Sequence, residues 1–345
     1  MGLWSTGALR LAVVVLAVAG LLAACSGDAG SSDAGVAEPG TSATPSASAP
    51  STPTSTPTST PTSTPAQTPR PTRQERPPRS VRVATALTAV QHLVGTIGPR
   101  PGTSPAYHRA AAWLQKRLTA LGYVVRRQPF PAPAGTSWGV PVPGGRSVNV
   151  VATWGRTDLH SPHLVVGAHL DTVPQAPGAE DNASGIGTLL AVAEAVAGRQ
   201  TRLPVVLVGF GAEEPRGPTD DDHHYGSRHY VASLGTQERR AVRGMVSLDR
   251  VGVGSALPVC SASDPPGPLR QAVLAAAERA DVPTVACTGN RASDHWSFVR
   301  AGLPGVRLGS TPYAGYHSAG DVVAVVNAPQ LRRAARTTVA WLSAP

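Results

Sequence analysis

Apolar residues recur with two different spacings along residues 82–345, and each spacing predicts one kind of element. Between positions 82 and 97 they have helical spacing, and a second helix is predicted from Tyr107 to Leu121, before Gly122. Shorter segments have the length and composition of strands, and several are apolar throughout. The expected strands are residues 123–127, 147–154, 163–168, 205–210, 245–248 and 304–308. Further helices are expected after Gly185, continuing through residues 189–197, and over 331–342.

Strands that are apolar on both faces are typical of parallel sheets covered by helices. In a right-handed parallel arrangement, the carboxyl ends of such strands meet at one edge of the sheet, where ligands bind. The pattern therefore predicts one α/β domain over residues 81–345 and directs attention to the residues that follow each strand.

Those residues are rich in imidazole and carboxylate groups. They are His169 and Asp171 after strand 163–168, Asp181 in the loop beyond it, Glu213 and Glu214 after 205–210, Asp249 after 245–248, and His317 in the loop after 304–308. Each has a structural alternative when taken alone, such as a helix cap at Asp181 or an exposed acidic turn at Glu213-Glu214. Their recurrence at successive strand ends favours one shared site.

This set of groups contains no thiolate and suits a pair of zinc ions about 3.5–4 Å apart. Asp181 offers two carboxylate oxygens, one for each cation. Asp171 can turn back at the strand end and accept the second imidazole N–H of His169. Of the two adjacent glutamates, one can bind a cation while Glu213 or Glu214, whichever remains, takes a proton from a metal-bound water.

These motifs together resemble the secreted di-zinc aminopeptidases of metallopeptidase family 28, the group of bacterial leucyl aminopeptidases and aminopeptidase Y. The matching motifs are His169-Leu-Asp171, Asp181-Asn-Ala-Ser-Gly185, Glu213-Glu214, Leu248-Asp249, Ser293-Asp294-His295 and Tyr316-His317-Ser318, with Gly98-Pro-Arg-Pro-Gly102 and Asn149-Val-Val-Ala152 earlier in the chain. The resemblance covers about residues 82–345. It implies a three-layer α/β sandwich with a mixed, mostly parallel central sheet, the zinc-dependent exopeptidase fold.

The resemblance also implies a role for each residue. His169 and Asp249 would bind one zinc ion, Glu214 and His317 the other, and Asp181 both. Glu213 would be the general base and then the general acid, Asp171 would orient His169, Tyr316 would help to stabilise the oxyanion, and Asp294 would lie near the substrate pocket. The implied reaction is hydrolysis of the N-terminal peptide bond by a water that the two zinc ions activate and Glu213 deprotonates. The implied partners are peptides with a free N-terminus, bound by a monomer.

Other functions remain open on the same residues. His169-Leu-Asp171-Thr-Val-Pro also resembles a neighbouring group of carboxypeptidases and deacylases, but that group needs a longer insertion before its last ligand. A glutaminyl-cyclase-like acyltransferase, typically with a single zinc, shares the fold, and an inactive binding lipoprotein would have the same scaffold. Residues 215–224 form a longer segment than compact family members have; we expect a solvated rim loop, with a further cation site as the alternative.

The first 80 residues differ in composition from the rest. Arg10 precedes an apolar stretch, residues 11–24, which ends in Leu22-Ala23-Ala24-Cys25 and resembles the lipobox of bacterial lipoproteins. We therefore expect a signal peptide over residues 1–25, a lipid on Cys25 and an extracytoplasmic protein, anchored to the membrane or secreted. An uncleaved anchor and an ordinary signal peptide cut near Ala24 are the alternatives, although the stretch is short for a membrane span.

Residues 26–80 repeat Thr, Pro and Ser and contain few groups to bury, so we expect a disordered spacer with polyproline II character. Its Thr and Ser side chains also permit O-glycosylation. Residues 70–82 contain five Arg and one Glu without interleaved aromatics, so we expect no nucleic-acid binding. In an exported protein, Cys260 and Cys287 are expected to form a disulfide, with two buried thiols as the alternative.

Overall fold

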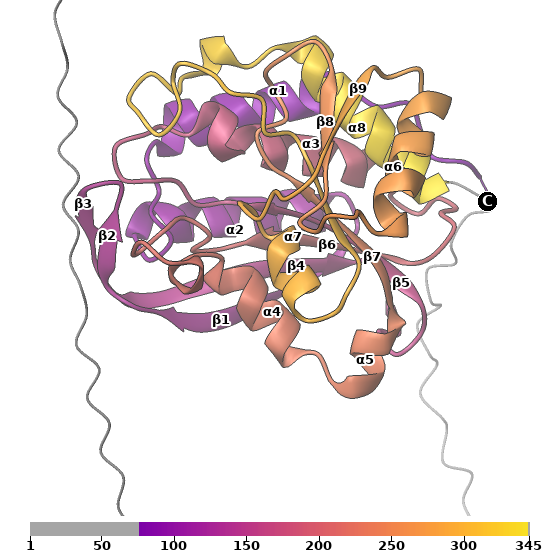
Figure 1. Ribbon diagram of the computed structural model, residues 1–345, viewed down its shortest axis with the longest axis horizontal. Helices are drawn as coiled ribbons and strands as arrows, with labels where there is room; N and C mark the ends of the chain where they lie inside the picture. The colour runs from indigo at the N-terminus through magenta and orange to yellow at the C-terminus, as the bar shows by residue number, and fades with distance from the viewer. Residues whose placement is uncertain (1–75, 344–345) are drawn as a thin grey trace, which may run out of the picture. The chain divides into compact units, whose positions relative to one another are not determined.

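This computed structural model describes residues 76–343 of the chain. Their central feature is an eight-stranded mixed sheet (Figure 1). The strand order is β1-β4-β6-β5-β7-β10-β8-β9. The strands are β1 (Val124–Ala132), β4 (Gly145–Thr153), β5 (His163–His169), β6 (Val205–Phe210), β7 (Val242–Leu248), β8 (Leu257–Cys260), β9 (Thr284–Cys287) and β10 (Gly305–Leu308). The neighbours β6, β5, β7 and β10 are parallel, whereas β4 and β8 run antiparallel to the outer members of that group.

Helices cover both faces of the sheet, which confirms the predicted three-layer α/β fold (Figure 1). One face packs against α1 (Val83–His92), α2 (Pro105–Ala120), α3 (Ser184–Val196), α6 (Pro268–Arg279) and α8 (Ala328–Ser343). The other face packs against α4 (Tyr225–Ser233) and α7 (His295–Arg300), and α5 (Thr236–Ala241) precedes β7. A separate hairpin, β2 (Gly135–Ser137) and β3 (Val140–Val142), lies between β1 and β4 in the chain.

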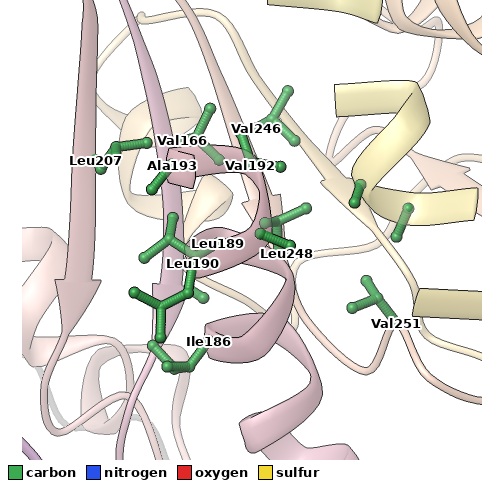
Figure 2. Packing of buried hydrophobic residues seen from close by; sticks show 14 of the residues in the cluster. Val166, Ile186, Leu189, Leu190, Val192, Ala193, Leu207, Val246, Leu248 and Val251 are labelled. Carbon is green, nitrogen blue, oxygen red and sulfur yellow. The ribbon is translucent and has the colours of Figure 1, made fainter. Parts of the chain in front are cut away.

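Helix α3 is buried along nearly its whole length, because it lies between the sheet and helices α1 and α8. Its side chains, among them Ile186 and Leu189, share one core with strand residues such as Val166 and Val246 (Figure 2). A Cβ at Gly187 would lie 2.6 Å from the carbonyl oxygen of Ala86, so only glycine permits this approach of α1. This packing fixes the segment that leads into α3, which contains Asp181.

Most elements of the sheet centre were predicted within a few residues, and β6 was predicted with its observed bounds. Helices α4 and α6, the edge strands β8 and β9 and the β2–β3 hairpin were not predicted. The edge strand β9 has only four residues, and its Val285 is 54% exposed, so it has no apolar pattern that marks a strand. Cys260 and Cys287, at the ends of β8 and β9, form the predicted disulfide.

The predicted signal peptide, Cys25 and most of the predicted spacer lie outside the described residues. The described part of that spacer already contacts the domain, because Arg79 N–H donates to Ala195 O (2.8 Å) and Arg76 O accepts from Gln200 N–H (2.9 Å). Between residues 76 and 343, no helix is long and apolar enough to cross a membrane.

Candidate active site

The sheet order brings the predicted site residues together at the carboxyl ends of three neighbouring strands. His169 is the last residue of β5, Glu213 and Glu214 follow β6, and Asp249 follows β7. Because β6, β5 and β7 are adjacent and parallel, these groups share one edge of the sheet. Asp181 reaches the same place from the segment before α3, and His317 from the loop after β10.

Asp181 lies between the two imidazoles, with one carboxylate oxygen directed at each. Its Oδ1 is 3.1 Å from His169 Nε2, and its Oδ2 is 3.1 Å from His317 Nε2. Asp249 Oδ1 lies 3.8 Å from the first imidazole nitrogen, and Glu214 Oε2 lies 3.5 Å from the second. Two sets of residues therefore share Asp181, namely His169-Asp181-Asp249 and Asp181-Glu214-His317, and the ligand atoms of each set lie within 4.8 Å of one another. The atoms of a third set, His169-Glu213-Glu214, lie equally close.

The buried charges of this cluster fit a pair of cations. Burial and the charges of Asp181 and Glu213 raise the pKa of Glu214 well above its usual range, and Glu214 Oε1 has no hydrogen-bond partner among the described residues. Burial would lower the pKa of His169, but Glu213 and the other nearby carboxylates raise it well above its usual value. Bound cations would compensate these carboxylates in place of protons. A donor set of imidazole nitrogens and carboxylate oxygens suits zinc.

Asp171 contacts the two glutamates through their backbone rather than through His169. Its carboxylate accepts hydrogen bonds from Glu213 N–H (3.0 Å) and Glu214 N–H (3.2 Å). Its Oδ1 is 3.8 Å from His169 Nδ1, which is too long for the predicted hydrogen bond to the imidazole. The position of Asp171 therefore fixes the turn after β6, and the expected bond that orients His169 is absent in this structure.

Two further acids, which were not predicted as site residues, hold the segment that carries Asp181. Asp321 accepts from the N–H groups of Glu180 (2.8 Å) and Asp181 (3.1 Å). Glu180 in turn accepts from Gly252 N–H (2.8 Å). Only the position of Asp321 four residues after His317 was visible in the sequence, and spacing alone does not reveal a contact with a segment 140 residues away.

Glu213 faces the cluster and lies beside a histidine that was not predicted. His224 is buried, and its Nε2 lies 3.1 Å from Glu213 Oε1, whereas Oε2 lies 4.0 Å from His169 Nε2. Burial would raise the pKa of Glu213, but the two imidazoles lower it below its usual range. The loop of residues 215–224 is thus only partly the expected solvated rim, because its aspartates are largely exposed whereas His224 belongs to the site.

Two arginines flank Asp249, and neither was predicted. Arg307, buried within β10, forms an ion pair with Asp249, with Nη2 2.9 Å from Oδ1, and Arg250 Nε lies 4.0 Å from the same oxygen. Burial would raise the pKa of Asp249, but Arg307 and His169 lower it to about 2. An arginine inside an otherwise apolar strand was the available signal for Arg307.

Aromatic side chains form the rim of a small cavity of about 60 Å³ over these groups. Trp138, from the turn between β2 and β3, is 55% exposed and lies 4.4 Å from the His317 ring, centroid to centroid. Tyr316 stacks on the same imidazole at 3.7 Å. Asp294, whose motif matched a pocket residue, does not line the cavity; it is buried, and burial raises its pKa well above its usual range.

The fold and the site together define a metallopeptidase. The sequence profile described as "Peptidase family M28" matches residues 149–342, which is more than half of the chain and includes all the clustered acids and histidines. The chain therefore belongs to peptidase family M28.

Several relatives and structures agree with this assignment. The chain is 28% identical over 235 residues to leupeptin-inactivating enzyme 1 of Streptomyces exfoliatus, which covers 66% of this chain and 49% of that protein. It is 30% identical over 162 residues to aminopeptidase YwaD of Bacillus subtilis, covering 46% of this chain and 34% of the relative. An uncharacterized Escherichia coli protein, YfbL, is 30% identical over 190 residues, covering 52% of this chain and 53% of that protein. The chain thus spans about half the length or less of these curated relatives.

Solved structures support the fold. A zinc aminopeptidase from Bacillus subtilis superposes with a TM-score of 0.68 at 18% identity, covering 76% of this chain and 94% of that chain. A glutaminyl cyclase from Bacteroides thetaiotaomicron superposes with a TM-score of 0.67 at 19% identity, covering 78% and 99%. Because the fold is common to both enzymes, only the site can separate their activities.

Proposed function

We propose that this protein is a di-zinc aminopeptidase, which hydrolyses the N-terminal peptide bond of peptides. The observation that carries the proposal is the position of Asp181, whose two oxygens face different imidazoles at 3.1 Å each. His169 and Asp249 would hold one zinc ion, Glu214 and His317 the other, and Asp181 both. Bound zinc would supply Lewis acidity, which acidifies a water molecule and polarises the scissile carbonyl.

Glu213 is the proposed general base, because it lies beside both ligand sets and is not needed to complete either. Its lowered pKa keeps the carboxylate ionised at neutral pH, so it can accept a proton from the attacking water. The proton would go to Oε2, because Oε1 faces His224. The same oxygen would then return the proton to the amine of the leaving peptide.

Tyr316 is proposed to stabilise the oxyanion. Burial and the charge of Asp181 raise the pKa of the phenol, so it stays protonated and can donate a hydrogen bond. The cavity is small and lined by several carboxylates, which favours a substrate that presents a free α-amino group there.

The test is a panel of aminoacyl p-nitroanilides and their N-acetylated counterparts, assayed with and without a chelator. Hydrolysis that needs a free amine, stops with chelator and returns with zinc is expected, with about two zinc ions per chain by metal analysis. Equal hydrolysis of the N-acetylated substrates, or full activity without metal, would rule out the proposed function.

Glutaminyl cyclase is a second candidate, because the solved cyclase superposes as well as the aminopeptidase does. A peptide with N-terminal glutamine separates the two, since an aminopeptidase releases glutamine and a cyclase releases ammonia. The two ligand sets that share Asp181, neither of which contains Glu213, favour the aminopeptidase.

For the whole chain, we further propose an exported lipoprotein that acts as a monomer. The support is the sequence Leu22-Ala23-Ala24-Cys25 after an apolar stretch and, independently, the disulfide in the catalytic domain. Labelled palmitate should be incorporated into the wild-type protein and not into Cys25→Ser.

A further inference from the structure

One cationic side chain at the cavity has no role in the proposed chemistry. Arg250 follows Asp249 directly and adopts a left-handed backbone conformation (φ 56°). Its backbone is held on both sides, since its N–H donates to Asn182 Oδ1 (3.2 Å) and its carbonyl accepts from Ser310 N–H (3.2 Å). The side chain lines the cavity and is 12% exposed.

The guanidinium of Arg250 is held in place, but some of its N–H donors have no acceptor among the described residues. It lies over the Tyr316 ring, with 4.4 Å between Cζ and the ring centroid, and Nη2 donates to Ser310 Oγ at 3.1 Å. Nη1 makes no hydrogen bond within residues 76–343. A guanidinium has five N–H donors in a planar fork that matches a carboxylate, so this side chain has donors available toward the cavity.

The carboxylates around Arg250 are committed to other groups. Its nearest anion, Asp249, lies 4.0 Å away, and the oxygen concerned is already 2.9 Å from Arg307. Asp181 directs both oxygens at imidazoles. The charges of Asp181 and Asp249 stabilise the Arg250 cation, but neither carboxylate forms a hydrogen bond with its guanidinium, so its free N–H donors remain available to a bound carboxylate.

Resting on the proposed aminopeptidase function, we propose that Arg250 binds a carboxylate of the substrate and so selects acidic substrates. The carboxylate has two possible sources, the side chain of an N-terminal Asp or Glu, or the C-terminal carboxylate of a dipeptide. The cavity lining contains acidic residues, which suit the α-amino group of the substrate, and also Arg250 and Arg307, of which Arg250 has donors available for a carboxylate.

The kinetic test compares kcat/KM of the full chain and its Arg250→Met variant on paired substrates. One arm uses Glu- and Leu-p-nitroanilide, and the other uses the dipeptide Leu-Ala and its amide, Leu-Ala-NH2. In one arm the wild type should have the higher kcat/KM on the carboxylate substrate. Arg250→Met should lower kcat/KM on that substrate by roughly 10- to 100-fold and change kcat/KM on the neutral substrate little. Arg250→Lys keeps the charge without the fork and should lose less.

The matched control is Arg202→Met, which removes another ring-stacked arginine, 5.1 Å from the Trp341 ring centroid and not among the residues that line the cavity. It should leave the substrate ratio unchanged. Thermal melting of each variant separates lost selectivity from lost folding. An unchanged ratio in a folded Arg250→Met protein, or no carboxylate preference in the wild type in either arm, would overturn the proposal.

Binding measurements keep this test separate from the proposed activity. Calorimetry in the Glu213→Gln background, with the α-amides of L-glutamate and L-leucine and with Leu-Ala and Leu-Ala-NH2, measures binding without turnover. The ligand with the extra carboxylate should bind more tightly in at least one pair while Arg250 is present, and the two ligands should bind alike once Arg250→Met is added. If the wild type hydrolyses no substrate but this difference is found, the aminopeptidase proposal fails and the carboxylate site stands; equal binding while Arg250 is present overturns the site.

Discussion

Two adjacent glutamates of this site have opposite electrostatic surroundings. Glu213 faces two imidazoles, which lower its pKa, whereas Glu214 faces the charges of Asp181 and Glu213, which together with burial raise its pKa. Pairs of acids whose surroundings separate their pKa values commonly divide the acid–base roles of an active site. Here the ionised Glu213 suits a base, and Glu214 suits a metal ligand because a cation would relieve its unfavourable charge.

Glu213→Gln should keep metal binding and lose kcat by about 10²- to 10⁴-fold, because the amide cannot accept the proton of the attacking water. Zinc content by metal analysis and kcat on an aminoacyl anilide are the two measurements. Glu238→Gln, in the first turn of α5, is the control and should retain full activity. Normal turnover by Glu213→Gln would remove the assignment of the base.

His224→Ala tests whether the histidine positions the base. Without Nε2 at 3.1 Å, Glu213 gains rotational freedom, and kcat should fall by roughly 10- to 100-fold while KM changes little. Because His224 also lowers the pKa of Glu213, the acidic limb of the kcat–pH profile should move to higher pH. His160→Ala, at an exposed site, should change neither; an unshifted profile for His224→Ala would contradict the positioning role.

The sequence was informative about residues that lie at strand ends. His169, Glu213, Glu214 and Asp249 could be predicted because a parallel sheet brings consecutive strand ends to one edge whatever the loops do. His224 could not, because its place depends on how one irregular loop folds back. It has a left-handed conformation that no pattern of apolar residues specifies.

At the scale of elements, the β2–β3 hairpin forms part of the rim and depends on one buried arginine. Arg216 Nη1 donates to the carbonyl oxygens of Pro133 (2.6 Å) and Pro143 (2.9 Å), which stand just before β2 and just after β3. Arg216 O also accepts from Thr136 N–H at 3.1 Å. The loop of residues 215–224 thus supports the hairpin that carries Trp138 over the cavity.

Arg216→Met should loosen the hairpin without touching the reacting groups. Trp138 lines the cavity and has no part in the proposed chemical step. Its displacement should therefore raise KM by roughly 3- to 10-fold and leave kcat nearly unchanged. Limited proteolysis should cut the variant within residues 133–143 sooner than the wild type. Arg333→Met, which removes a local contact on α8, is the control. An unchanged KM together with an unchanged cleavage pattern would separate the hairpin from substrate binding.

Elements were predictable where burial imposed a pattern on both faces, as in β5 and β6, whose residues are all buried. They were not predictable where the pattern came from tertiary contacts. Helix α4 contains few apolar residues, and it packs on the sheet through Tyr230 and Val231. The hairpin has three-residue strands, which are too short to show alternation.

For the molecule as a whole, the cluster of buried acids lowers the stability of the metal-free fold. The cluster contains four buried carboxylates within one small region, and folding must desolvate them together. Metal binding should therefore appear in the global stability of the domain as well as in activity.

Zinc should raise the melting temperature of the chelator-treated protein, and the rise should grow from pH 5 to pH 8. In the metal-free fold the pKa values of Glu214 and His169 are raised above their values in the unfolded chain, 4.5 and 6.5. Each group therefore makes its full contribution to stability when the pH is below its pKa in the unfolded chain. This stability is lost as the pH rises through their folded pKa values. Zinc needs both groups deprotonated, so protons compete with it at pH 5 and less at pH 8.

Melting curves with and without zinc across this pH range measure the effect, and His317→Ala provides the control that isolates one ligand set. That variant should retain a smaller rise, because His169, Asp181 and Asp249 can still hold one ion. A zinc-induced rise that is the same at pH 5 and pH 8 would contradict the linkage between these protons and the metal. If the melting temperature of His317→Ala rises as much as that of the wild type, the proposed second zinc ion is contradicted. Loss of the Asp181-Glu214-His317 set would then have no effect on zinc binding.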